Sequence, residues 1–556
     1  MTEDKEQVSF SNETDELEKQ DKEIVVISSS EELLTFLLDI LDFGDNVESE
    51  EILENNNSYK ILSMLLKKIP VLTVVIEYKY VDRIYRDSYY MHFSCKHGKY
   101  ERFCKRLFLF EGNLFVDGPS VDFPDLDKKI LQEKFIGTIV VRPLKEGKIG
   151  RVLISPYFLI EQNNTYMRYA KYSATIYGIR LQINAFPFSM QDGETTTCAE
   201  ITLLNLMDYF SRKYSEYRSI LPSEIAEATE RNGYERNMPS RGLGYPVITK
   251  VFGDAGFSPR LYSRNLFADM SQFKRIMHYF IESGLPVAVG VKVDEKTRHS
   301  VVCIGHGEIQ YDKIGRKIYA VYDTMGGNHI WLIDSADLCD NYIVMDDGHS
   351  PYENFEWKST GEKGRAADKS TLGAYEPDTL MVPLYKRMFL EAQDAYDICT
   401  SALASKEVGV QRFKPELGTK KSPVIIRLFM CSSRNYKQRR ITNFGIKNKE
   451  VRERYINLLL PRFVWVCEIY DSRGYIRGKM IGEIVIDATA SPYDGSKSIL
   501  LFHYPYHILV CQRNIKNVKR LFDKDENFER VNDWEPFTRY DHNLFSPKEI
   551  KANENR

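Results

Sequence analysis

The sequence lacks the features that mark several broad classes of protein. No stretch reaches the roughly 18 uninterrupted apolar residues of a membrane-spanning helix. The best candidate, residues 63–75, is interrupted by two lysines and a proline. The chain opens on an acidic segment rather than on a basic segment followed by an apolar run, so we expect no secretory signal. These absences predict a protein without membrane insertion.

Cysteine is present but forms no framework. The nine cysteines are scattered and contain no CxxC pair. Such a set is typical of reduced thiols in the cytoplasm, where we therefore place the protein. Cys95, His97 and Cys104 lie close in sequence, but their spacing matches no zinc pattern. We expect neither a metal nor another cofactor.

The chain also lacks a strong net charge. It has 76 Lys and Arg against 79 Asp and Glu, a balance that argues against a protein dedicated to nucleic acid. The charge is nevertheless uneven: residues 1–56 hold 18 acidic and 3 basic residues, whereas residues 410–480 hold 17 basic and 5 acidic residues. Either the two segments complement each other or stay solvated, or 410–480 forms a basic surface for an acidic partner.

The 556 residues divide by pattern into an acidic tail and three regions. Residues 1–22 are expected to be disordered, and 23–180 to form a strand-rich domain. In 181–385 the pattern changes from helices to an antiparallel meander, which indicates an α+β class. Residues 386–556 predict a further α/β domain that contains the basic stretch. Strand-like runs in the N-terminal domain are residues 71–80, 89–94, 108–115 and 136–143.

Cys198 begins a predicted helix over 197–212 and follows three threonines that can cap it. The positive end of a helix dipole favours a thiolate, the nucleophilic form of cysteine. Gln191 lies seven residues upstream in a turn-like segment. Its side-chain amide and the Cys198 backbone N–H can form an oxyanion hole. A catalytic cysteine is therefore a candidate at this helix start.

His299 and Asp323 supply the two partners that such a thiol needs. His299 opens a strand-like run after a polar hairpin, so its imidazole can act as base to the thiol and as acid to a leaving amine. Asp323 ends the next predicted strand, which we expect to lie beside that of His299. A carboxylate there can orient the imidazolium as the third member of a triad.

The segments Phe186–Gln191 and Cys198–Glu200 resemble the oxyanion and nucleophile region of papain-like cysteine peptidases. The helix 271–283, Gly284-Leu285-Pro286, the strand 287–293 and the run from His299 resemble the second half of the bacteriocin-processing type. The resemblance covers about 200 residues, 181 to 384. It implies a papain-like core with a helical lobe and an antiparallel sheet lobe. It also implies the roles given above for Gln191, Cys198, His299 and Asp323, acting on a peptide or protein substrate.

Other assignments stay open. His306 is a competing imidazole, His329 could line the cleft, Gln182 could replace Gln191, and Asp323 could cap a turn. The leading hypothesis is hydrolysis of a peptide or isopeptide bond through an acyl-enzyme. A transglutaminase-like acyltransferase or deamidase would use the same triad. A catalytically inactive scaffold that acts as a sensor or adaptor is the third hypothesis.

Overall fold

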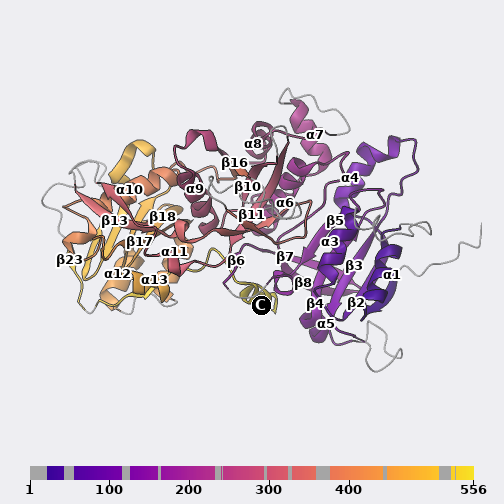
Figure 1. Cartoon of the computed structure of the whole chain (residues 1–556), viewed down its shortest axis with the longest axis horizontal. Coiled ribbons are helices and arrows are strands. Elements are labelled where there is room, and N and C mark those ends of the chain that lie inside the picture. The colour runs from indigo at the N-terminus through magenta and orange to yellow at the C-terminus, as the bar shows by residue number, and fades with distance from the viewer. Residues whose placement is uncertain are drawn as a thin grey trace, which may run out of the picture. The chain divides into compact units, whose positions relative to one another are not determined.

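The computed structural model describes residues 22–42, 56–114, 126–160, 164–231, 240, 242–293, 297–322, 328–357, 376–442, 448–511, 528–532 and 534–555. It confirms the α+β class, since helices accompany sheets in which almost all neighbouring strands are antiparallel (Figure 1). The predicted disordered tail, except for its last residue, lies outside the described residues. No helix in the described ranges has the length and apolar character that crossing a bilayer would require.

The chain forms two compact units. The first comprises residues 1–154 and 173–183, and the second comprises 155–172 and 184–556. The regions 181–385 and 386–556 meet in the second unit, where strand β13 (His329–Asp334) of the former pairs with β17 (Val424–Ser432) of the latter. The two predicted regions therefore share one sheet.

The first unit is built on an antiparallel meander in the order β1-β2-β3-β4-β5. Its central strand β3 contributes four consecutive fully buried residues, Leu107 to Phe110, to the core. The elements are β1 (Lys22–Ile27), β2 (Leu72–Tyr80), β3 (Cys104–Glu111), β4 (Phe135–Val141), β5 (Ile149–Ile154), α1 (Ser30–Ile40), α3 (Asn57–Leu66), α4 (Arg83–Met91) and α5 (Lys128–Lys134). A hairpin of β7 (Ala170–Ile176) and β8 (Ile179–Ala185) follows.

The strand predicted at 89–94 is wrong. Residues 83–91 form helix α4, and residues 93–95 form a 3-10 turn. The Asp82 side chain caps the helix by accepting a hydrogen bond from the Tyr85 backbone N–H at 2.8 Å. A capped helix start thus outweighs the strand-like pattern of this segment.

The second unit contains two larger sheets. The first has the order β15-β14-β11-β10-β16-β9, and β6 also pairs with β11. Helix α6 packs on β11, the central strand that carries His299. The elements are β6 (Tyr166–Met167), β9 (Arg260–Ser263), β10 (Val287–Lys292), β11 (Arg298–His306), β14 (Asn341–Met345), β15 (Glu353–Glu356), β16 (Glu376–Val382), α6 (Cys198–Lys213), α7 (Pro222–Arg231), α8 (Tyr245–Asp254) and α9 (Met270–Glu282).

The other sheet of this unit has the order β12-β13-β17-β18-β20-β21-β22-β23. Helix α9 contacts β11 of the first sheet and β17 of this one, and its residues 276–282 are buried all round (Figure 1). The remaining elements are β12 (Tyr319–Tyr322), β18 (Phe463–Tyr470), β19 (Lys479–Met480), β20 (Gly482–Asp487), β21 (Ile499–Tyr504), β22 (His507–Val510), β23 (Glu529–Arg530), β24 (Phe537–Thr538), α10 (Ala392–Ala404), α11 (Ser433–Thr442), α12 (Lys449–Asn457), α13 (Ser472–Ile476) and α14 (Pro547–Ala552).

Part of the basic stretch 410–480 is turned into this unit rather than towards solvent. Arg440 is 1 % exposed and binds Glu468 and Glu483 at 2.8 and 2.7 Å. Arg427 binds Glu468 at 2.9 Å and Glu282 of α9 at 2.6 Å. These arginines neutralise buried glutamates, so they are not available to an acidic partner. The proposed basic surface can use only the other basic residues of the stretch.

Candidate active site

Cys198 is the first residue of α6, and a capping box fixes the helix start. Thr197 is the N-cap, and its backbone N–H donates to Glu200 Oε2 at 3.1 Å. Glu200 is fully buried and also accepts a hydrogen bond from Ser240 Oγ at 2.7 Å. The Cys198 side chain is neither buried nor fully exposed. A partly accessible thiol therefore lies where the helix dipole favours negative charge.

The loop before this helix is ordered by Asp192. Its Oδ1 accepts backbone hydrogen bonds from Glu194, Thr195 and Thr196 at 2.9, 2.7 and 2.8 Å. Such a turn fixes the backbone between Gln191 and the helix. Gln191 itself is partly buried, and its backbone amide interacts with the Asp347 carboxylate. The loop thus brings Gln191 to the site, while the oxyanion role of its side chain stays a prediction.

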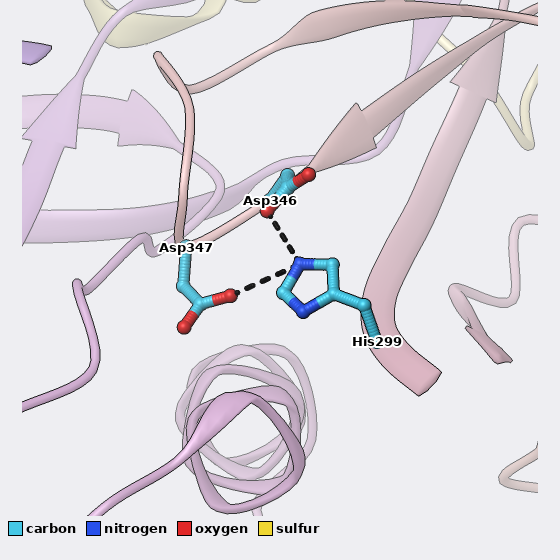
Figure 2. Close-up of side chains that lie close together, drawn as sticks. All are labelled: His299, Asp346 and Asp347. Atoms are coloured by element: carbon cyan, nitrogen blue, oxygen red, sulfur yellow. Dashed lines mark hydrogen bonds and ion pairs between the residues drawn. The ribbon is translucent and has the colours of Figure 1, made fainter. Parts of the chain in front are cut away.

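His299 of β11 meets both the thiol and a carboxylate. Its Nε2 lies 2.7 Å from Asp346 Oδ1 and 3.4 Å from Asp347 Oδ1 (Figure 2). The Cys198 side chain interacts with the same ring and contributes to the raised pKa of His299. Because Nε2 faces the carboxylates, Nδ1 is the nitrogen left for the thiol. Figure 2 shows that the second ring nitrogen points away from both carboxylates.

These contacts favour the charged imidazolium. Burial alone would lower the pKa of His299, but the hydrogen bonds to Asp346 and Cys198 and the charges of Asp346 and Asp347 raise it to about 11. The same ion pair acts on the acid: although burial opposes ionisation, His299 and His349 hold the pKa of Asp346 below its ordinary range. An imidazolium beside a sulfur stabilises the thiolate form.

Asp346 is held by a turn directly after β14. Its side chain is fully buried, its Oδ1 also accepts the Gly348 backbone N–H at 2.9 Å, and its Oδ2 accepts His349 Nδ1–H at 3.0 Å. Strand β14 pairs antiparallel with β11, and Met345 at its end lies opposite Val302. The residue after β14 is therefore close to the start of β11, where His299 lies. Asp346 therefore has the position that the orienting acid of a triad requires.

Asp347 is a second carboxylate with a different environment. It is 4 % exposed, and within the described residues neither of its oxygens makes a hydrogen bond of normal geometry. Burial raises its pKa to about 7, the charge of Asp346 adds to this effect, and the His299 charge opposes it. The pKa values of the two adjacent acids are thus shifted in opposite directions, because Asp346 has the hydrogen bonds that Asp347 lacks.

His299, Asp346 and Asp347 also offer one nitrogen and two oxygens within 4.8 Å of one another. A metal ion would need the neutral imidazole as its ligand. The contacts of His299 favour its protonated form instead, and Nε2 is already engaged by Asp346. The donor set therefore fits a protonated histidine held by a carboxylate better than it fits a metal centre.

The sequence pattern placed the carboxylate beside His299 at Asp323 and did not single out Asp346, which the structure places there. Asp323 lies outside the described residues, but the strand before it, β12, pairs with β13 in the other sheet. The expectation that this strand adjoins the strand of His299 is wrong, since β11 has β10, β14 and β6 as neighbours. The signal that could have identified Asp346 is the segment Asp346-Asp347-Gly348-His349 directly after an apolar strand.

The competing residues lie elsewhere. His306 is at the far end of β11, buried, with Nε2 3.4 Å from Glu282. His329 belongs to β13 of the other sheet. Gln182 belongs to the first compact unit and exchanges hydrogen bonds with Gln132. Within the described residues, neither His306 nor His329 makes a hydrogen bond or ion pair with Cys198 or His299.

Comparison with known proteins assigns no relative to this chain. No protein-family model, no curated protein and no solved structure matches it. The function of this site is therefore inferred from its geometry.

Proposed function

We propose that this chain is a thiol hydrolase that cleaves a peptide or isopeptide bond through an acyl-enzyme, with a papain-like arrangement of Cys198, His299 and Asp346. One observation carries the proposal. A partly accessible thiol at a helix N-terminus interacts with an imidazole whose Nε2 lies 2.7 Å from a buried carboxylate. Nucleophile, base and orienting acid are the three roles that acyl transfer requires.

In the proposed reaction, Cys198 Sγ attacks the carbonyl carbon of the substrate. The π electrons of the C=O bond move to the carbonyl oxygen, which becomes an oxyanion. The Cys198 backbone N–H and the Gln191 side-chain amide donate hydrogen bonds to this oxyanion. When the tetrahedral intermediate collapses, the C–N bond breaks and His299 gives its proton to the leaving amine. Water then attacks the thioester, His299 accepts its proton, and the acid is released with the thiol regenerated.

Asp346 acts through His299 in this scheme. Its hydrogen bond to Nε2 orients the ring so that Nδ1 faces the sulfur, and its charge stabilises the imidazolium. The Gly348 and His349 hydrogen bonds keep the carboxylate from rotating away. The turn 346–349 is thus the support of the proposed triad.

The reactivity of the thiol tests the proposal without a known substrate. The protein is treated with iodoacetamide at pH 6, and alkylation of each cysteine is followed by mass spectrometry. Cys198 should react much faster than the exposed Cys95, and His299→Ala should remove this advantage. Equal rates for Cys198 and Cys95 in the unaltered protein would contradict the proposed ion pair.

Hydrolysis is then measured on a library of peptides and branched isopeptides. Cys198→Ala should abolish cleavage, whereas Cys95→Ala should leave it unchanged, since Cys95 has no role in the proposed reaction. EDTA should have no effect. Cleavage that survives Cys198→Ala would show that another group is the nucleophile.

A further inference from the structure

A cavity lies at the opposite end of the helix that carries Cys198. It has a volume of about 410 Å³, within the range of small-molecule sites. Lys213, the last residue of α6, lines it together with Arg168 and Tyr214. At 1.5 Å per residue, this end of α6 is roughly 22 Å from Cys198. The cavity is therefore separate from the proposed triad.

Arg168 places a buried positive charge on the cavity wall. It is 6 % exposed, its Nε donates to Tyr209 Oη at 2.9 Å, and its Nη1 donates to the Asn543 carbonyl. No carboxylate of the described residues pairs with it, although a guanidinium stays charged. A buried charge without a counter-ion is costly unless a ligand supplies one.

The absence of a side chain at Gly284 leaves room for this guanidinium. Its φ is +74°, and a Cβ there would lie 3.0 Å from Arg168 Nη1 and 2.9 Å from the Asn543 carbonyl oxygen. A side chain at this position would therefore displace the arginine. The turn after α9 is adapted to the presence of the buried cation.

Lys213 adds a second positive charge. Its Nζ lies 5.3 Å from the centre of the Tyr169 ring, and no described residue forms a hydrogen bond or ion pair with it. Burial, together with the charges of Arg168 and Lys171, lowers its pKa to about 7. The lysine is thus half-buried beside another cation. A bound anion would stabilise its charged form.

The remaining charged groups of the cavity have partners of their own. Arg462 binds Glu216 at 3.0 Å, and His542 Nδ1 lies 3.6 Å from Asp541. No Asp or Glu is among the described residues that line the cavity. The charges of Arg168 and Lys213 are therefore the unbalanced ones.

One wall of the cavity is aromatic. Tyr385 stacks on Phe463 with ring centres 5.2 Å apart and planes at 4°, and Tyr214 meets Tyr385 edge-on at 5.4 Å. All three line the cavity. Such a wall provides an apolar surface for the uncharged part of a ligand.

We propose that this cavity binds a small phosphate monoester, with the phosphate at Arg168 and Lys213 and the organic part against the aromatic wall. A phosphate monoester carries close to two negative charges at neutral pH and so matches the two unbalanced cations. A monocarboxylate would leave one cation uncompensated. The proposal does not depend on the proposed hydrolysis, because no residue of the triad belongs to the cavity.

Calorimetry with phenyl phosphate and with benzoate tests the proposal on the full chain. Phenyl phosphate should bind saturably with one site, and benzoate of the same ring should bind much more weakly. Lys213→Met should weaken phenyl phosphate binding by about tenfold or more, because it removes a charge-assisted contact. Lys213→Arg should retain binding. Lys250→Met, which changes an exposed lysine of α8, is the matched control and should bind as the unaltered protein does.

Chemical modification gives a second measurement that does not require a variant to fold. Acetic anhydride at pH 7 should acetylate Lys213 faster than Lys250, and phenyl phosphate should slow the reaction at Lys213 alone. Absence of binding, equal binding of benzoate, binding unchanged by Lys213→Met, or no protection of Lys213 would each overturn the proposal.

Discussion

Replacement of Asp346 tests the proposed site most directly. In Asp346→Ala, His299 loses the acceptor that lies 2.7 Å from its Nε2. A hydrogen bond to a charged group contributes about 1.5–3 kcal/mol, so kcat/KM should fall by about 10- to 150-fold from this contact alone. Loss of the support that the turn gives to the ring adds to the effect.

Asp346→Asn should be milder. The amide oxygen can still accept from His299 and from the Gly348 backbone N–H, but the bond becomes neutral and contributes about 0.5–1.5 kcal/mol. We expect a loss of about tenfold in kcat/KM, since the difference between the two kinds of bond is about 1–1.5 kcal/mol. The pKa of His299 should fall, because the Asp346 hydrogen bond and charge are among the main effects that raise it.

The assay combines kcat/KM on a cleaved library peptide with NMR titration of labelled His299 and with the iodoacetamide rate of Cys198. The rate of alkylation reports the site even if no library peptide is cleaved. Asp323→Asn is the informative comparison, since the sequence pattern alone assigned the acid to Asp323. It should leave all three measurements unchanged. Loss of activity in Asp323→Asn together with wild-type behaviour of Asp346→Ala would refute the assignment made from the geometry.

Three further predictions concern stability. Arg440→Met should lower the free energy of unfolding in urea by about 3–5 kcal/mol, because it removes the arginine that pairs with the buried Glu483 and leaves the buried Glu468 with Arg427 alone. The pKa of His306 is raised to about 10, so its contribution is complete below about pH 6.5 and is lost as the pH rises through 10; His306→Gln should flatten the fall in urea stability over this interval. The pKa of Asp347 is raised from 3.8 to about 7, so folding loses stability as the pH rises through this interval. Asp347→Asn should therefore be more stable than the unaltered protein at pH 8, by about 1–3 kcal/mol in the same assay.

Local features of the proposed site could be predicted from the sequence because they depend on neighbouring residues. The threonines before Cys198 predict a helix start, and Thr197 is indeed the N-cap of α6. The apolar run after His299 predicts a strand, which the structure contains as β11. Caps and alternating apolar residues act within a few positions, so one segment suffices to identify them.

Strand order could not be predicted in the same way. β12 and β13 follow β11 in sequence, but β13 pairs in parallel with β17, about ninety residues later, and leaves the place beside β11 to β14. Parallel pairing depends on which buried surfaces fit together after long connections, and a single sequence does not state this. The identity of the acid changes with it, because the carboxylate beside His299 is the one at the end of its actual neighbour.

The burial of basic residues in 410–480 could not be predicted from the sequence either. Counting Lys and Arg in 410–480 gives no information on which of them are buried, whereas Arg427 and Arg440 lie in the core with glutamates from α9, β18 and β20. A long-range ion pair requires both partners to be located, so composition could not show that these two arginines belong to an internal network.

The charged clusters of this unit differ in whether their positive and negative charges balance. This difference distinguishes a structural cluster from one that can bind a charged ligand. The internal network pairs two arginines with three glutamates, and the protonated His306 beside Glu282 supplies the missing positive charge. At the proposed triad, His299 and Asp346 balance each other and leave the thiol to meet a substrate. At the cavity of Arg168 and Lys213, two cations line a space to which the described lining residues contribute no carboxylate. A buried guanidinium stays charged, so one that the fold does not balance is stabilised by an anion from outside, and for this reason we assign a ligand to that cavity and none to the network.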